Sequence, residues 1–149
     1  MPALNQIEFN PYCVDEEIIG ACRAFGIVIQ AYAPLGSGLR DKETTQIGIV
    51  MISIVSSTTL CNFRNYFAVL NDTTMKDISE RIGCSVAQLC IAWALKRKVA
   101  VVTKTENRSR MDENFNSRSF VDALTPEYVA KIDALNLNLR KFWKIYNQP

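Results

Sequence analysis

The residues best suited to bind a ligand follow a short apolar run in the second half of the chain. Lys104 comes after five uncharged residues typical of a strand, so its ammonium group should emerge where that strand ends. Thr105 and Arg110 follow it closely. A lysine point charge together with a forked guanidinium suits a dianionic phosphate. A lone lysine at the end of a strand is more often simply solvated, so whether Lys104 binds a phosphate depends on the residues around it.

Composition removes several classes of chemistry. The sequence has no histidine, which excludes imidazole metal ligands, a histidine triad and a histidine general base. Its five cysteines are an odd number without C-x-x-C spacing, so reduced thiols are expected rather than a disulfide framework or a zinc site. The net charge is +2 and the cations are spread out, which predicts neither a nucleic-acid nor a membrane partner. Without a signal peptide or an apolar run long enough to span a bilayer, we expect a cytoplasmic protein.

The first part of the chain predicts a βαβ unit. Residues 3–9 are a strand candidate, Asp15 is a helix N-cap, and Gly26 ends that helix. Residues 27–33 form an apolar, β-branched run that is typical of a parallel strand buried on both faces. The residues at helical spacing that should form the apolar face of the helix are Ile18, Ile19, Cys22 and Phe25.

The second part repeats this alternation of helix and strand. A helix is predicted after residues 72–74 and should end at Gly83, and a second should begin after Ser85. Residues 99–103 form another apolar strand, and Thr125 precedes a last helix with proline at its first position. Alternating strands and helices indicate an α/β fold with parallel strands and right-handed crossovers. The length of 149 residues suits one domain, whereas a complete (β/α)8 barrel needs roughly 250 residues.

One stretch does not fit the pattern, an atypical insertion at about residues 40–70. Residues 47–69 have no clear period, cap or turn residues, and they are more apolar than a loop should be. One interpretation is an extra hairpin packed on the domain. Another, which we favour, is sequence foreign to the mature protein, such as translated intron, because the residues before and after it would join as an ordinary polar loop.

Three motifs in order resemble the aldo-keto reductase family. Residues 5–12 (NQIEFNPY) are similar to the sixth barrel strand of that family, and residues 31–37 (AYAPLGS) to its seventh strand and following loop. Residues 104–115 (KTENRSRMDENF) are similar to the signature of its eighth strand. The resemblance covers nearly all of the chain outside residues 40–70. It implies a partial (β/α)8 TIM barrel, equivalent to strands 6–8 and their helices, in a single domain over residues 1–149.

The same resemblance implies an NADP-dependent oxidoreductase that acts on small aldehydes and ketones. Tyr32 would stack on the nicotinamide and Gln6 would hydrogen bond its carboxamide. Lys104, Thr105 and Arg110 would clamp the adenosine 2′-phosphate, which favours NADP over NAD. The remaining cofactor-binding positions that the motifs imply are Leu35 and Ser37 in the pyrophosphate loop and Glu113 and Asn114 at the adenine.

The chain also departs from the family pattern. Asn10 replaces the usual histidine, Ala33 replaces the usual serine, and Glu106 places a carboxylate near the expected phosphate. The family's catalytic Asp, Tyr, Lys and His lie on the first four strands, and no residue here matches their roles. Three interpretations stay open: a piece of a carbonyl reductase that is inactive alone, a fragment that retains some nucleotide affinity, or an interaction module that self-associates through exposed sheet edges.

Overall fold

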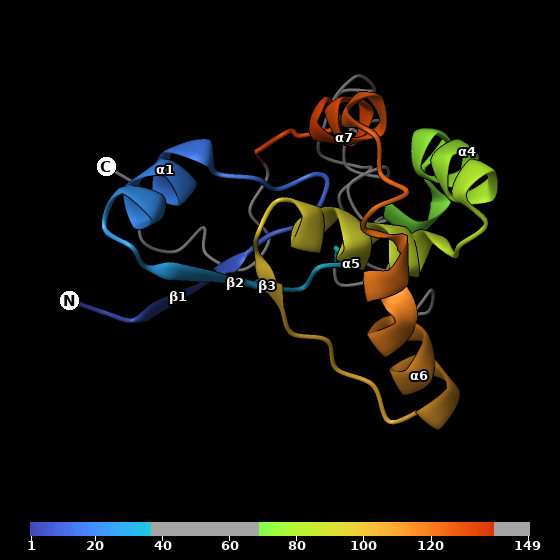
Figure 1. The fold of residues 1–149 in the computed structure, drawn as a ribbon, viewed down its shortest axis with the longest axis horizontal. Helices are drawn as coiled ribbons and strands as arrows, with labels where there is room; N and C mark the ends of the chain where they lie inside the picture. The colour runs from blue at the N-terminus through green and yellow to red at the C-terminus, as the bar shows by residue number, and fades with distance from the viewer. Residues whose placement is uncertain (37–68, 139–149) are drawn as a thin grey trace, which may run out of the picture.

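The computed structural model describes residues 1–36 and 69–138 of the chain. Within them, a three-stranded parallel sheet has the order β1-β2-β3 and is formed by Leu4–Glu8, Val28–Tyr32 and Ala100–Val101 (Figure 1). The helices are α1 (Glu16–Ala24), α4 (Thr73–Ile82), α5 (Val86–Lys96), α6 (Arg108–Asn116) and α7 (Pro126–Asp133), with short 3-10 turns η1 (Val69–Asn71) and η2 (Ser117–Phe120). The predicted α/β fold with parallel strands is confirmed.

The parallel register places the carboxyl ends of the strands at one edge of the sheet. Glu8 at the end of β1 pairs with Tyr32 at the end of β2. Ala31 pairs with Val101, and the Val102 N–H continues the pairing by donating to the Ala31 carbonyl at 3.0 Å. Ligands of barrels built from such units bind at the carboxyl ends of the strands, so this edge is where the candidate site must lie.

The helices begin directly after the N-cap residues that the sequence predicted. The side chain of Asp15 accepts a hydrogen bond from Ile18 N at 3.0 Å, and that of Asp72 accepts one from Met75 N at 3.0 Å. Thr125 caps α7, whose first residue is Pro126. Gly83 ends α4 with φ of 78°, in the left-handed region that glycine adopts without steric penalty.

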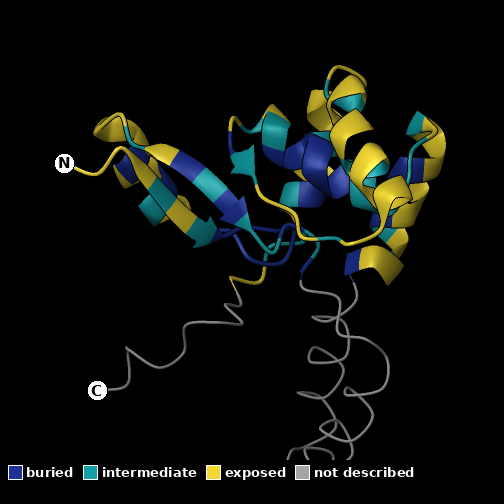
Figure 2. Ribbon diagram, turned by 90° about the horizontal axis from the view of Figure 1, so that it is seen from below, coloured by how far each residue is buried: buried dark blue, intermediate teal, exposed yellow. Residues whose placement is uncertain are grey.

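The core lies where α4, α5 and α7 meet the end of β1. The ring of Trp93 on α5 stacks on that of Phe9 with centroids 4.8 Å apart, and both side chains are fully buried. Met75, Leu89 and Ile132 add buried apolar surface from the three helices. Figure 2 shows the buried residues gathered where the helices meet and the exposed ones on their outer surfaces. Among the described residues, no helix is long and apolar enough to cross a membrane.

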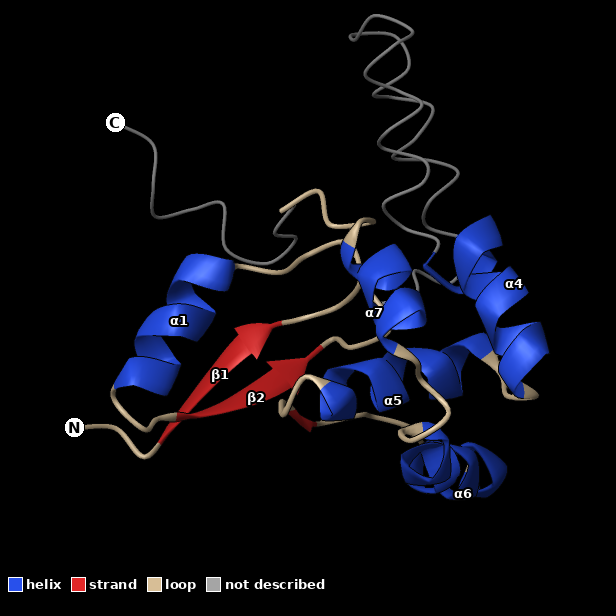
Figure 3. Ribbon diagram, turned by 45° about the horizontal axis from the view of Figure 1, so that its top comes forward, coloured by secondary structure: helices blue, strands red, loops and turns tan. Residues whose placement is uncertain are grey.

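The prediction that the second strand is buried on both faces is wrong. Ile29 and Ala31 are buried, but Val28 is 53% exposed. The buried face is the one that α1 covers, as the contact from Asn5 Nδ2 to Cys22 Sγ at 3.4 Å shows, and α1 lies alongside β1 and β2 in Figure 3. The strand is half exposed because, within the described residues, helices cover one face of the sheet only.

Two smaller predictions need correction. Phe25 does not join the apolar face of α1: it is the C-cap residue, with φ of −97° and ψ of 5°, and is 62% exposed because the chain turns away there. Val69, which the sequence grouped with the anomalous segment, is 1% exposed and belongs to the core. The rest of that segment, up to residue 68, lies outside the described residues, so the choice between hairpin and foreign sequence remains a prediction.

Candidate functional site

The sheet contributes one group of predicted cofactor ligands. Gln6 lies beside Gln30 in the register, on the less covered face, and its Nε2 donates to Gln30 Oε1 at 2.9 Å. Tyr32 is half-buried at the end of β2, two residues further along the same face. The bond to Gln30 fixes the orientation of the Gln6 amide. Sequence reasoning missed Gln30, although its place two residues before Tyr32 in an apolar strand was a signal.

The turn after β2 is held by a buried asparagine. Asn10 is 1% exposed, its Oδ1 accepts from Tyr12 N at 3.0 Å, and its Nδ2 lies 3.5 Å from the carbonyl oxygen of Ala33. Ala33 has φ of 51°, a left-handed conformation that costs free energy for a residue other than glycine. Asn10 therefore links the ends of β1 and β2 from the position where the family usually has histidine.

The predicted pyrophosphate loop is described only in part. Leu35 is half-buried and packs against the core, whereas Ser37 lies outside the described residues. Gly36 has φ of 69°, and a Cβ atom added to it would lie 2.9 Å from Cγ2 of Val69. Both conformation and space therefore require glycine here. The same contact shows that residues 36 and 69 lie side by side.

The predicted phosphate ligands lie on the loop before α6 and in its first turn. Lys104 and Arg110 are exposed and Thr105 is half-buried. The side chain of Asn107 caps α6 by accepting from Arg110 N at 3.2 Å, and Thr105 Oγ1 accepts from Asn107 N at 3.2 Å. Positive side chains here add to the positive end of the helix dipole, so the arrangement suits an anion. Sequence reasoning did not identify the Asn107 cap, because α6 has no buried residue and thus no apolar periodicity.

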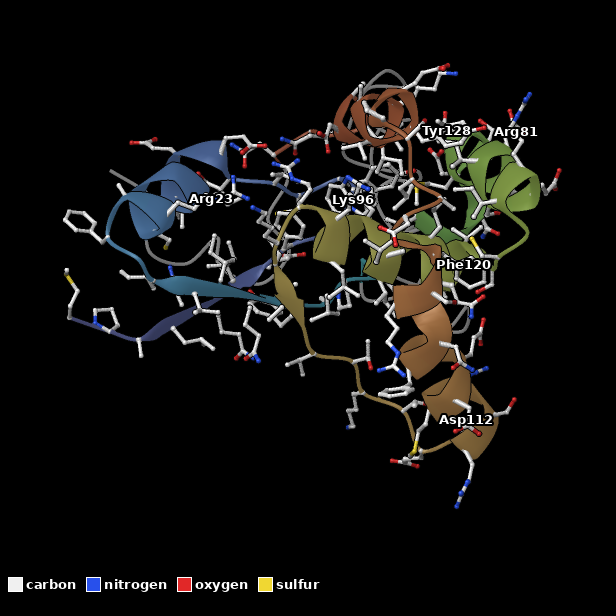
Figure 4. All side chains as sticks on the ribbon, viewed as in Figure 1. Arg23, Arg81, Lys96, Asp112, Phe120 and Tyr128 are labelled. Atoms are coloured by element: carbon white, nitrogen blue, oxygen red, sulfur yellow. The ribbon has the colours of Figure 1, made fainter. Side chains whose placement is uncertain are left out.

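The last two predicted ligands, Glu113 and Asn114, lie further along α6 and are half-buried. Asn114 Nδ2 donates to Thr103 Oγ1 at 3.4 Å, which ties the helix to the loop after β3. Glu113 accepts a hydrogen bond from the Ser85 hydroxyl at the beginning of α5. The described site residues thus lie in three places: on β1 and β2, in the turn after β2 at Leu35, and on the loop and helix that follow β3. Figure 4 shows α6, marked by Asp112, projecting away from the sheet.

A hollow in the surface lies away from these residues. It measures about 600 Å³ between α4 and α7, and Figure 4 labels Arg81 and Tyr128 in its wall. Its charges compensate one another: Lys131 Nζ lies 2.8 Å from Glu127 Oε1, and that hydrogen bond lowers the pKa of Glu127. No group of three or more metal-ligating side chains occurs among residues 1–36 and 69–138.

Comparison with known proteins decides the family. The model of the aldo/keto reductase family matches residues 1–137 of the chain. The chain belongs to the aldo/keto reductase family. Among curated relatives, it is 35% identical over 115 residues to a glycerol 2-dehydrogenase (NADP(+)) from Hypocrea jecorina, which covers 77% of this chain and 30% of that protein. It is 30% identical over 139 residues to the pig (Sus scrofa) aldo-keto reductase family 1 member A1, covering 93% of this chain and 36% of that protein.

Solved structures show the same fold. An aldo-keto reductase from a Medee basin deep-sea metagenome library matches with a TM-score of 0.73 and 21% identity, over 98% of this chain and 43% of that chain. A variant of Gox0644 in complex with NADPH matches with a TM-score of 0.68 and 23% identity, over 91% and 39%. This aldo/keto reductase chain therefore spans about a third of the length of the two curated relatives above, and its fold is a partial barrel.

Proposed function

We propose that these 149 residues form a single partial barrel domain that carries the NADP-binding part of an aldo/keto reductase, without the residues that protonate the substrate. The observation that carries the proposal is the Asn107 cap, which links Thr105 to Arg110 at the beginning of α6, directly after Lys104 in the chain. Hydride transfer to an aldehyde or ketone also needs an acid for the carbonyl oxygen, and no residue of this chain matches that role in the family.

The donor set fits the 2′-phosphate of NADP. Lys104 supplies a point charge, Arg110 a forked guanidinium, and the first turn of α6 the backbone N–H groups that Asn107 does not cap, all at an exposed position where a nucleotide can approach. Glu113 and Asn114 would follow at the adenine, and Leu35 and Ser37 at the pyrophosphate. When bound, NADPH supplies the hydride. Gln6 and Tyr32 would hold the nicotinamide ring that carries it, against a small carbonyl substrate.

Nucleotide preference tests the proposal. Titration calorimetry with NADPH and with NADH should show tighter binding of NADPH to the unaltered chain. Lys104→Ala should weaken NADPH binding by roughly tenfold, the effect of losing one hydrogen bond to a charged group, and leave NADH binding unchanged. Lys76→Ala, an exposed lysine on α4, is the matched control and should change neither affinity. Equal affinity of the unaltered chain for both nucleotides would contradict the proposal.

A non-catalytic interaction fragment is the alternative, and the exposed sheet face favours it. Leu4, Val28 and Val102 are 43%, 53% and 41% exposed there, and apolar residues grouped in this way promote self-association. Sedimentation of the purified chain over a range of concentrations tests this, and a monomer throughout would contradict it. We also propose a cytoplasmic location, in keeping with Cys22, Cys84 and Cys90, none of which is in a disulfide.

A further inference from the structure

Helix α6 carries Arg110, Glu113 and Asn114, yet none of its residues is buried. A surface helix of nine residues is marginal by itself, because most helical stability comes from packing an apolar face. The position of three proposed cofactor ligands therefore depends on the polar contacts that fasten α6 to the rest of the molecule. The structure shows where those contacts are concentrated.

Two side chains at the beginning of α5 hold the middle of α6. The Ser85 hydroxyl donates to the Glu113 carboxylate, and Gln88 Nε2 donates to the Glu113 carbonyl oxygen at 3.1 Å. Ser117, which is fully buried, donates to the same carbonyl at 3.3 Å. Both the side chain and the backbone of Glu113 are thus fixed, so the helix can neither rotate nor slide without breaking hydrogen bonds.

The same two side chains also cap α5. Ser85 Oγ accepts from Gln88 N at 3.2 Å, and Gln88 Oε1 accepts from Ser85 N at 3.1 Å. Capping α5 accounts for these two bonds. It does not account for the two further bonds to Glu113, which use the donor hydrogen of the hydroxyl and one of the amide hydrogens.

We propose that Ser85 and Gln88 are positioning residues for nucleotide binding, a role that rests on the proposed function and that the family motifs in this sequence do not assign to them. They act through Glu113 and need not touch the nucleotide. By fixing α6 they hold Arg110 beside Lys104 and Thr105, so that the three can engage one phosphate together. Ser85 donates to Oε1 of Glu113, which leaves Oε2 as an acceptor for the adenine amino group.

A matched pair of substitutions at Ser85 separates this role from capping. Ser85→Gly removes the hydroxyl, while glycine at an N-cap costs helix stability little. Ser85→Thr keeps both the cap and the donor to Glu113. The probe is adenosine 2′,5′-bisphosphate, which engages the α6 side of the site without the nicotinamide, and amide hydrogen exchange reports on α5 and α6 separately.

We expect Ser85→Gly to bind the bisphosphate about tenfold more weakly, in line with the loss of a hydrogen bond to a charged group. Amide exchange in α6 should accelerate while α5 keeps its protection, and Ser85→Thr should restore both readings. Gln88→Glu retains the acceptor for Ser85 N but loses the donor to the Glu113 carbonyl, so it should weaken binding in the same direction.

Any of four results would overturn the inference. Unchanged bisphosphate binding by Ser85→Gly, or faster exchange in α6 without weaker binding, would show that the contact positions no ligand. Binding by Ser85→Thr as weak as that by Ser85→Gly would show that the hydroxyl is not the determinant. Failure of the unaltered chain to bind the bisphosphate would instead remove the proposed function itself, and this inference with it.

Discussion

Arg97, at the end of α5, contacts α7, α1 and the residue that follows β1. Substituting it is therefore a strict test of the contacts that stabilise the fold. Its Nη1 lies 2.8 Å from Asp133 Oδ1 on α7, and its Nη2 pairs with Glu16 on α1. The guanidinium carbon lies 5.6 Å from the ring centroid of Phe9 and 5.5 Å from that of Trp93. We predict that Arg97→Met, which keeps the aliphatic stem, destabilises the protein by about 1.5–5 kcal/mol.

The contributions to this figure differ because the partners differ in exposure. Glu16 is 60% exposed, so its pair should contribute less than about 1 kcal/mol. The hydrogen bond to Asp133 should contribute about 1–2 kcal/mol, and the contacts with the two rings about 0.5–2 kcal/mol. Asp133 keeps its bond from Trp93 Nε1 at 2.8 Å and Glu16 is exposed to water, so neither carboxylate is left buried and unsatisfied. Burial acts to lower the pKa of Arg97, but Glu16 and Asp133 raise it overall, so the charge persists.

Urea unfolding followed by tryptophan fluorescence measures the loss. Arg97→Lys keeps the charge but not the fork, so its stability should lie between those of the unaltered chain and Arg97→Met. Arg108→Met, at an exposed position on α6, is the control and should change stability little. A double-mutant cycle with Asp133→Asn isolates that pair. A loss below about 0.5 kcal/mol, within the range of an ordinary surface substitution, would refute the reasoning.

Three further predictions follow from other parts of the molecule. Burial and the hydrogen bond to Asp72 raise the pKa of Tyr12 above its ordinary 10.0, and burial raises the pKa of Cys90 above 9.0. The folded state therefore holds these protons more tightly than the unfolded chain. The free energy of unfolding should keep its full value below about pH 9 and fall as the pH rises. Urea midpoints between about pH 8 and 10.5 check this, and Cys90→Ala should reduce the slope even if it lowers the midpoint; a flat profile would contradict it. Residues 36 and 69 lie side by side, so deleting residues 40–67 while sparing Val69 should leave the urea midpoint and light scattering unchanged or improved. The reason is that shortening the loop changes stability by only about 1–2 kcal/mol. A large drop in the urea midpoint would make the segment a structural part of the protein. Finally, NADPH oxidation with a panel of aldehydes and ketones should match the background without protein, and turnover abolished by substituting a residue of this chain would show that it carries its own acid.

Local chemistry determined much of the fold in advance. Asp15, Asp72, Ser85 and Thr125 begin helices because their side chains accept hydrogen bonds from backbone N–H groups three residues ahead. Gly83 ends α4 because a left-handed residue is needed there. The apolar runs gave the strands and, with the helices between them, their parallel order. Such features depend on residues close together in the chain, so the sequence suffices.

Tertiary structure decided the features that depend on which surfaces meet. The second strand is apolar apart from Gln30, yet Val28 is exposed because no described element covers that face. Helix α6 gave no periodic signal because it buries nothing, and its position comes from Ser85, 28 residues from Glu113 along the chain. Gln30 orients Gln6 only because the register sets them side by side. The motifs could therefore name candidate ligands, but packing and strand register, which bring distant residues together, determine how those ligands are held.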